Sequence, residues 1–209
     1  LALTPPFNWQ GEFEGRMLNP SAKWPEWPGV LDLDTTISGE LSEQGPAIAI
    51  TLSSLKGTLR ERPVKGQTGA SWRGGVASIK ALQLQVGTAR LQAEGTVGDE
   101  WMISAQLDAP DIHDLLPQGQ GRLKATGTLS GPRMKPGISL QLEGGDLSLG
   151  ETRADSLLAD IELDLQDRRP SHVILQLNQL QLPGFEQQSA TLTARGPLSA
   201  HKLNLEARS

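Results

Sequence analysis

The sequence predicts an all-β fold, in which an elongated antiparallel sheet is folded lengthwise into an open trough and repeats along its length as a quasi-solenoid. Three observations predict this fold. Apolar residues recur at every second position, helix signals are nearly missing, and one short pattern returns at intervals of roughly 32 to 35 residues. With 23 Gly and 14 Pro among 209 residues, the chain also carries the turn residues that many short strands require.

Alternation of apolar and polar side chains predicts the individual strands. It places the apolar set on one face of each strand and the polar set, such as Gln83 and Gln85, on the other. A sheet with one wet face is typical of antiparallel pairing. Clear examples of the alternation are Leu31/Leu33/Thr35/Ile37, Ile48/Ile50/Leu52, Leu82/Leu84/Val86, Leu123/Ala125/Gly127/Leu129, Ile138/Leu140/Leu142 and Leu175/Leu177.

Gly and Pro residues between the alternating runs predict the turns. Counting runs between these residues predicts about 15 short strands. The residues used are Gly74-Gly75, Gly87, Gly95, Gly131-Pro132, Gly144-Gly145, Gly150 and Pro183-Gly184.

Two segments depart from the strand pattern. Residues 18–29 form the one long irregular loop, and its Trp24 and Trp27 are interpreted as anchors against the first strands, with ligand binding as the alternative. Residues 110–117 predict a short helical turn that Asp111 caps and Pro117 ends. Otherwise we expect residues 1–209 to form one continuous, repeat-built β domain.

An internal repeat relates distant parts of the chain. Residues 90–97, 122–129 and 191–198 share the pattern Leu-x-Ala-x-Gly-x-(Val/Leu), and a weaker copy begins at Leu157. The spacing predicts a unit of two or three strands that stacks on copies of itself.

The apolar face of such a sheet must be covered, and helices are not available to cover it. A closed barrel of this many strands would enclose a lumen too wide for aliphatic side chains to fill. The remaining alternatives are a sandwich that is packed shut and a trough that is held open. Inward positions are mostly Leu, Ile, Val and Ala, with Gly95, Gly127 and Gly196 among them, which favours the trough. A closed aliphatic sandwich with no ligand is the alternative.

The alternation of side chains between the two faces of each strand predicts which of them line the concave face. These residues are the candidate lining of a groove for lipid: Leu31, Leu33, Ile48, Ile50, Leu82, Leu84, Leu91, Leu123, Leu140, Leu142, Leu175, Leu177, Leu192, Leu203 and Leu205.

Composition argues against several other functions. The formal charge is −5, without the basic excess of a nucleic-acid partner, and with no Cys there is no disulfide or thiolate metal site. His113, His172 and His201 are too far apart in sequence to suggest a metal site. No apolar run is long enough to span a membrane. The first residues, LALTPP, have neither an initiator Met nor a signal-like segment, so we expect a piece of a longer protein with its targeting signals elsewhere.

Two motifs superficially suggest chemistry. Asp32-x-Asp34 resembles the start of a calcium loop, but Ile37 occupies the position of the required Gly and the run alternates as a strand does. Ser53-x-x-Lys56 matches a serine acylase pattern that normally opens a helix, and its companion motifs are missing. We therefore expect no enzyme activity, no catalytic residue, no cofactor and no metal.

Several short motifs occur in a characteristic order and spacing along the chain: LNP at 18–20, WPG at 27–29, LKGTLRERPVKG at 55–66, LDAPDIHDLLP at 107–117, GRLKATGTLSGP at 121–132 and KPGISLQL at 135–142. On these residues the chain resembles the TamB family, within the AsmA-like group of bacterial envelope proteins. The resemblance implies a central segment of a much larger protein with a β-taco fold, no catalytic motif, and a place in the periplasm of a Gram-negative bacterium.

The resemblance also implies partners. The full-length protein is expected to be anchored in the inner membrane and to meet an outer-membrane barrel partner, TamA, both through parts absent from this chain. Two functions go with it: transport of phospholipid between the two membranes, and assistance to outer-membrane proteins such as autotransporters. The apolar positions favour lipid, because a scaffold would use strand edges and be indifferent to the interior.

Overall fold

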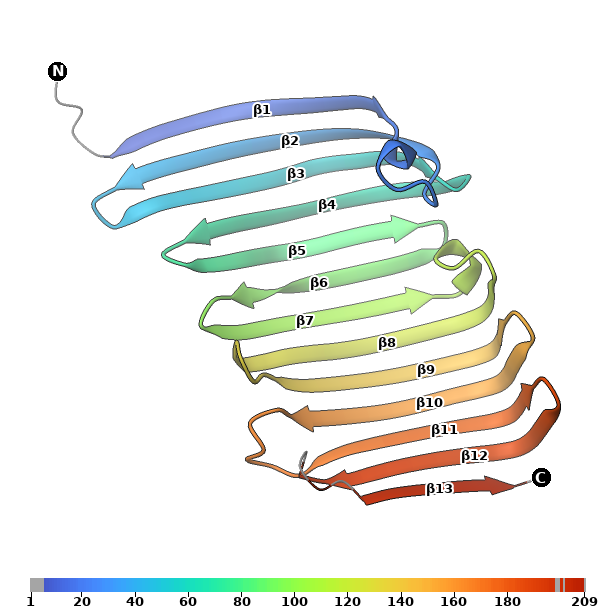
Figure 1. The fold of residues 1–209 in the computed structure, drawn as a ribbon. Coiled ribbons are helices and arrows are strands. Elements are labelled where there is room, and N and C mark those ends of the chain that lie inside the picture. The colour runs from blue at the N-terminus through green and yellow to red at the C-terminus, as the bar shows by residue number, and fades with distance from the viewer. Residues whose placement is uncertain (1–5, 198–199, 201, 209) are drawn as a thin grey trace. The chain divides into compact units, whose positions relative to one another are not determined.

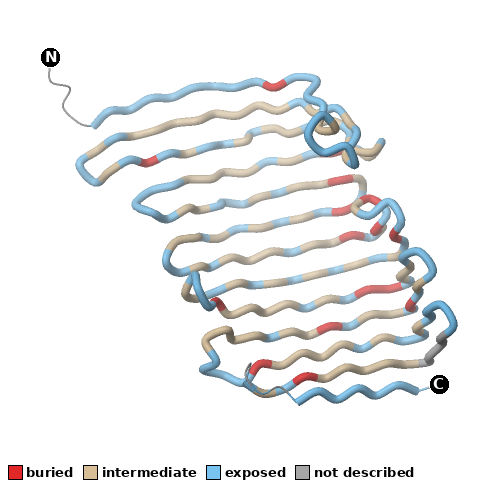
Figure 2. Tube along the Cα trace, viewed as in Figure 1, coloured by how far each residue is buried: buried red, intermediate tan, exposed pale blue. Residues whose placement is uncertain are grey.

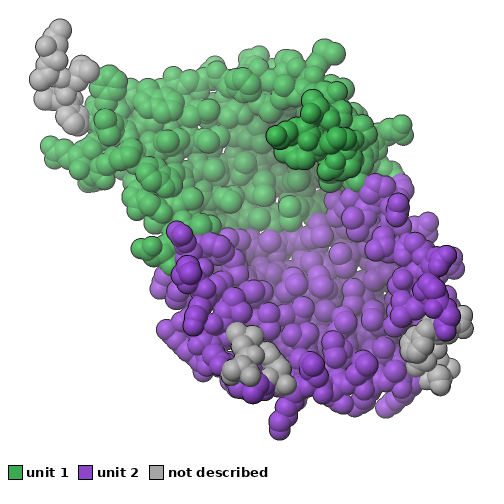
Figure 3. Space-filling model, viewed as in Figure 1, with its two compact units in different colours: residues 1–99 green, residues 100–209 purple. Residues whose placement is uncertain are grey.

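A computed structural model describes residues 6–197, 200 and 202–208 of the chain. Leu198 of the third repeat copy and His201 lie outside these residues. Cα proximity divides the chain into two compact units, Leu1–Asp99 (unit 1) and Glu100–Ser209 (unit 2), which we describe separately (Figure 3).

Unit 1 is a meander in which each strand pairs antiparallel with the next (Figure 1). Its elements are β1 (Phe7–Leu18), the 3₁₀ turn η1 (Pro20–Ala22), β2 (Gly29–Ser42), β3 (Gly45–Leu59), β4 (Arg62–Arg73), β5 (Val76–Val86) and β6 (Ala89–Val97).

Unit 2 continues the same pattern, again with antiparallel pairing between successive strands. Its elements are β7 (Glu100–Ala109), the 3₁₀ turn η2 (Ile112–Asp114), β8 (Gly119–Pro132), β9 (Gly137–Leu149), β10 (Thr152–Asp164), β11 (Ser171–Leu182), β12 (Phe185–Gly196) and β13 (Lys202–Arg208). The predicted all-β, antiparallel, open fold class is confirmed.

The strand count expected from the turn residues was too high. The described residues form 13 strands. Gly74, Gly87, Gly150 and Gly184 do mark turns, but Gly95 and the pair Gly144-Gly145 lie inside strands. Gly inside a strand often marks a bulge or a close approach rather than an end. The runs on either side of such glycines therefore belong to one longer strand.

The repeat corresponds to a two-strand hairpin. Leu91 lies on β6, Leu123 on β8, Leu157 on β10 and Leu192 on β12, so equivalent positions fall on every second strand. Each copy therefore supplies one outgoing and one returning strand, which settles the choice between two and three strands per repeat.

The strands of unit 1 bend along a row of bulges. Every pairing in this unit shifts register, between Gly15 and Leu18 on β1, at Asp34/Thr35 on β2, between Leu52 and Leu55 on β3, and at the matching positions of β4 and β5. A bulge kinks its strand and increases the local twist. Because these bulges neighbour one another across the sheet, they form a crease that runs across the strands.

Neither unit has a closed core, and few residues in the described parts are buried (Figure 2). The buried apolar side chains are mostly Ala, and Val64 is the largest of them that is nearly inaccessible. The chain exposes 14006 Å², whereas a compact monomer of 22.4 kDa would expose about 9,400 Å². Much of the apolar surface is therefore not covered by a second layer.

Candidate functional site: the uncovered apolar face of each unit

In unit 1 the register places the predicted apolar residues on one face. Directly paired residues of antiparallel strands lie on the same side of a sheet. One row of such pairs runs from Leu33 on β2 through Leu55, Gly66 and Leu84 to Leu91 on β6. Leu31, Ile48, Ile50 and Leu82 belong to the same face by the same pairings.

In unit 2 a comparable row crosses every strand. It runs through Leu107, Ala125, Leu142, Ala159, Leu175, Leu192 and Leu205, in strand order from β7 to β13. Leu123, Leu140, Leu177 and Leu203 lie on this face in neighbouring rows. Leu and Ala alternate from β7 to β11, so Ala159 is buried between the larger side chains of Leu142 and Leu175.

The two apolar faces remain open to solvent within their own units. Ile48 and Ile50 are 41% and 40% exposed, and Leu203 and Leu205 on the last strand are 73% and 70% exposed. Core aliphatic residues of a packed-shut sandwich would be almost fully buried. Lateral contacts between neighbouring side chains cover part of each residue, and the side facing away from the backbone stays uncovered.

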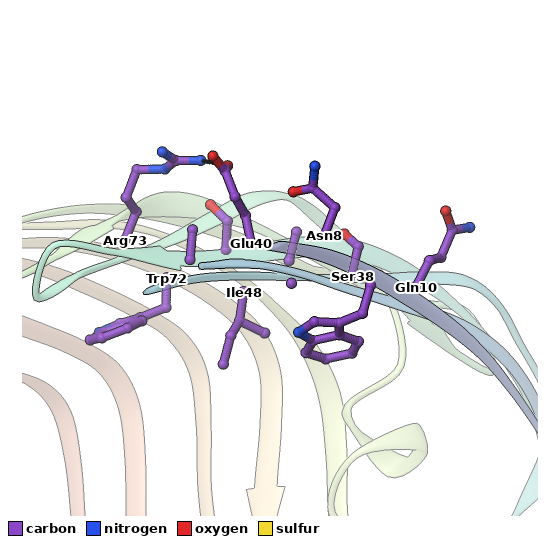
Figure 4. Close-up of a pocket in the computed structure, with 12 residues that line it drawn as sticks. Asn8, Gln10, Ser38, Glu40, Ile48, Trp72 and Arg73 are labelled. Carbon is purple, nitrogen blue, oxygen red and sulfur yellow. Dashed lines mark hydrogen bonds and ion pairs between the residues drawn. The ribbon is translucent and has the colours of Figure 1, made fainter. Parts of the chain in front are cut away.

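The opposite face of unit 1 is polar. Around β1–β4 (Figure 4), Arg73, Glu40 and Asn8 project from one side of the sheet, while Ile48 and Trp72 project from the other. A hollow of about 590 Å³ lies among these strands, and Arg73 donates to Glu40 across 2.8 Å at its border. Because small residues such as Ala47, Ala49 and Ser71 share the polar side of β3 and β4 with this ion pair, we assign the hollow to the polar face.

The acidic pair on β2 has a structural role. Asp34 pairs with Arg16 across 2.6 Å, and the Asp32 carboxylate accepts a hydrogen bond of 2.8 Å from the Met17 backbone amide. Arg16 and Met17 are the two residues of the β1 bulge that lie opposite the single residue Asp32. The short contact with Asp34 raises the pKa of the Arg16 guanidinium. These carboxylates therefore stabilise the crease, and the run that contains them forms part of β2, as the alternation predicted.

The remaining candidate motifs also lie in ordinary strand and turn structure. Ser53 and Lys56 both lie on β3, and the Ser53 hydroxyl donates to the Asp34 carbonyl at 3.1 Å. His172 on β11 lies 3.2 Å from Asp160 on β10, and the Asp111 carboxylate caps η2 by accepting from the His113 amide. In the described part of the chain, no three His, Asp or Glu side chains are grouped to hold a metal ion.

Aromatic residues on the face of unit 1 were missed by the sequence analysis. Trp9 and Phe13 on β1 are paired with Gly39 and Thr35, and Trp72 on β4 is paired with Ile48, so all three share the apolar face. Each is between 40% and 55% exposed. The parity rule that selected the aliphatic residues would have selected these positions as well, because they follow the same alternation.

The chain belongs to the TamB family. The family model described as "TamB, N-terminal domain" matches residues 1–209. A relative from Haemophilus influenzae, named "Translocation and assembly module subunit TamB", is 24% identical over 143 residues. The match covers 68% of this chain and 11% of that relative, so the chain corresponds to a small part of it. No solved structure matched the chain.

None of the helices in the described residues is long and apolar enough to cross a membrane. The name of the Haemophilus relative describes that protein as one subunit of a module for translocation and assembly.

Proposed function

We propose that this chain shields phospholipid acyl chains on the apolar faces of its two units, as a periplasmic segment of a protein that moves lipid between the inner and outer membranes. The observation that carries the proposal is the row of Leu and Ala across every strand of unit 2, in which Ala159 is buried and every Leu keeps part of its surface accessible. The predicted lining residues named above are the proposed contacts.

The energetic argument concerns the aqueous gap between two membranes. Exposing acyl chains to water costs about 0.8 kcal/mol per methylene, or on the order of 12 kcal/mol for a 16-carbon chain. Contact with a row of Leu side chains recovers much of this cost. The rows run across the strands, which are spaced about 4.8 Å apart, so a chain moving along a row exchanges one apolar contact for the next.

The headgroup would stay in solvent, because the apolar face is open rather than enclosed. No chemical step is required, so the proposed role involves no catalytic residue, cofactor or metal. The membrane anchor and the contact with TamA belong to other parts of the protein.

Assistance to outer-membrane protein assembly is the second candidate function. It is favoured by the name of the Haemophilus relative and by β1, which has only β2 beside it in the described structure. An incoming strand could pair with such an edge through main-chain hydrogen bonds. This function would depend on the edge backbone and little on the apolar face.

The test combines lipid extraction with crosslinking. We expect mass spectrometry of the purified protein to detect bound phospholipid, and a photoreactive amino acid in place of Leu123 to crosslink to it. Leu140→Arg, on the same face, should abolish crosslinking while the urea midpoint of unfolding changes little. Gln141→Arg is the matched control, because this neighbour lies on the polar face and should leave crosslinking unchanged.

Two outcomes would contradict the proposal. One is lipid crosslinking that persists in a folded Leu140→Arg protein. The other is the absence of phospholipid from the parent protein.

A further inference from the structure

A pocket lies where the loop of residues 18–29 meets the apolar face of unit 1. It has a volume of about 510 Å³, and its lining is mostly apolar. Leu18, Leu31 and Leu59 contribute from β1, β2 and β3, and all three lie on the apolar face by their pairings. The loop contributes Asn19, Pro20, Lys23, Trp24 and Trp27. The pocket is thus continuous with the proposed lipid surface of this unit.

The loop that forms the pocket has a defined internal structure. Asn19 caps η1 by accepting from the Ser21 amide at 3.1 Å, and the Trp24 amide donates to the Pro20 carbonyl at 2.9 Å. The Arg60 amide, in the β3–β4 turn, donates to the Pro28 carbonyl at 2.6 Å. These bonds fix the loop against the ends of β2 and β3, so the pocket is preformed.

The two tryptophans of the loop have different roles. Trp27 is partly buried, and the Arg60 guanidinium carbon lies 4.1 Å from its ring centroid, a cation–π contact that ties the loop to the next turn. Trp24 is 58% exposed although it borders an apolar pocket. The anchoring role inferred from the sequence therefore applies to Trp27, whereas more than half of the Trp24 surface is not covered by packing within the chain.

The residues that line the pocket differ in polarity between the strands and the loop. The strands contribute only Leu, whereas the loop contributes Asn19 and Lys23, and Lys23 is exposed and makes no ion pair in the described structure. Glu26, Asp32 and Glu61 are the carboxylates nearest in sequence to the lining residues, and Asp32 lies on the opposite, polar face, where it accepts from the Met17 amide; Arg60 and Arg62 are the neighbouring cations. Indole rings favour the boundary between apolar and polar regions of a lipid, where the ring is dry and its N–H is wet.

We infer that this pocket binds the glycerol and headgroup end of a glycerophospholipid. An acyl chain lies on Leu18, Leu31 and Leu59, the Trp24 indole packs at the level of the ester groups, and Lys23 faces the phosphate. The inference rests on the proposed lipid function and adds a defined headgroup site to it.

A polypeptide is a poorer occupant than a lipid. β2 and β3, which contribute Leu31 and Leu59, are paired on both sides, whereas β1, which contributes Leu18, has a free edge in the described structure. A peptide paired with that edge would extend the sheet beside β1 and would not lie on the apolar face. An extended peptide lying over the pocket would leave its own backbone groups without partners on an apolar floor. A lipid brings no such groups to the floor.

The test places a photoreactive amino acid at Leu59, in the pocket, and in a second protein at Leu123, on unit 2. Each is mixed with vesicles containing either phosphatidylglycerol or a diacylglycerol with the same acyl chains. We expect phosphatidylglycerol to crosslink at Leu59 about tenfold more than diacylglycerol. Lys23→Glu should remove that preference, and Trp24→Ala should lower crosslinking of both lipids at Leu59 several-fold.

Matched variants separate the site from general effects. Val30→Ala truncates another exposed apolar side chain, on the polar face of β2 and outside the pocket, and Lys65→Glu makes the same charge change on the polar face of β4. Both should leave crosslinking at Leu59 unchanged.

Equal crosslinking of the two lipids at Leu59, insensitive to Lys23→Glu, would overturn the inference. Crosslinking at Leu123 but not at Leu59 would overturn the headgroup site and remain consistent with the proposed lipid-transport function. Absence of lipid crosslinking at both positions would overturn the lipid-transport function as well. Capture of a polypeptide at Leu59 in place of added lipid would also overturn the site.

Discussion

The apolar face of unit 1 mixes aromatic and aliphatic side chains, whereas that of unit 2 is built from Leu, Ile and Ala, with Trp101 on its first strand. In unit 1, Trp9 lies over Gly39, so closely that a Cβ at Gly39 would overlap the indole. In unit 2, small residues such as Ala159 instead lie between neighbouring Leu side chains. Both units leave an apolar face open, but unit 1 places Trp9 and Phe13 on its edge strand β1 and Trp72 on β4.

The backbones differ in the same way. Every strand pairing in unit 1 shifts register, whereas in the described part of unit 2 a shift occurs only between β8 and β9, at Gln120/Arg122. Bulges re-aim side chains and bend a sheet. The difference teaches that unit 1 combines a creased sheet with a preformed pocket, whereas unit 2 presents a more regular row of side chains.

The strongest expected effect comes from a glycine at the edge of the crease. Gly57 on β3 has φ +146°, and a Cβ there would overlap the Val30 carbonyl oxygen on β2. Gly57→Ala should therefore force β2 and β3 apart and destabilise unit 1 by about 4 kcal/mol. Hydrogen exchange should show lost protection in β2–β4, while β9–β12 of unit 2 stay protected, as expected when each repeat depends on its neighbours.

Gly11→Ala on β1 is the matched control, because its added methyl would meet nothing within 4 Å. Equal loss of protection in both units after Gly57→Ala would show that they unfold as one, and the comparison between separate units would then fail.

The next effect concerns lipid rather than stability. Leu84→Asp in unit 1 and Leu142→Asp in unit 2 each place a carboxylate among acyl chains, at a cost of about 2.5 to 3.5 kcal/mol. Lipid crosslinking beside each substitution should fall about 70- to 400-fold, which is this cost converted at 1.36 kcal/mol per tenfold change. The unfolding free energy should change by less than about 1 kcal/mol, because the face is open to water.

Gln83→Asp and Gln141→Asp serve as controls on the polar face of the same strands. If the introduced charge lowers lipid crosslinking in only one unit, acyl chains bind only to the apolar face of that unit.

A smaller effect tests the contact between Trp9 and Gly39. Gly39→Ala alone should destabilise the protein by about 1 to 3 kcal/mol, because its methyl overlaps the Trp9 ring. In a Trp9→Ala background the same change should be neutral or stabilising by up to about 1 kcal/mol, since Ala suits a strand better than Gly does. A double-mutant cycle by urea unfolding measures this coupling. Additive effects would mean that the ring does not rest on Gly39.

The smallest effect compares charges on the two polar faces. In unit 1, Lys56 and Lys65 are directly paired, whereas in unit 2 Lys124 pairs with Asp108 on one side and Glu143 on the other. Lys65→Glu should therefore stabilise the protein, and Lys124→Glu should destabilise it, each by about 0.2 to 1 kcal/mol. Both changes should shrink in 1 M salt. Effects of the same sign would contradict the cross-strand pairings.

Much of the fold could be predicted from local patterns. Alternation identified the strands and the shared face of residues such as Leu33 and Leu84 in unit 1, or Leu140 and Leu142 in unit 2, since side chains alternate between the two faces within a strand. The spacing of Leu123 and Leu192 identified the repeat. The strand count was wrong because Gly95 and Gly144 look the same in sequence whether they end a strand or lie within one.

The sequence by itself therefore determined the all-β class, antiparallel pairing, the polar and apolar faces and the existence of a repeat, whereas the structure decided that each repeat is a two-strand hairpin. Tertiary structure alone decided where the alternation of side chains between the two faces shifts by one residue, as it does between Gly15 and Leu18 or between Leu52 and Leu55. A bulge at such a position is defined by the pairing with the partner strand. Tertiary structure also decided that Leu18, Leu31, Leu59 and Trp24 meet in one pocket. Alternation is a property of neighbouring residues, whereas a pocket depends on how a loop docks against strands that are distant in sequence.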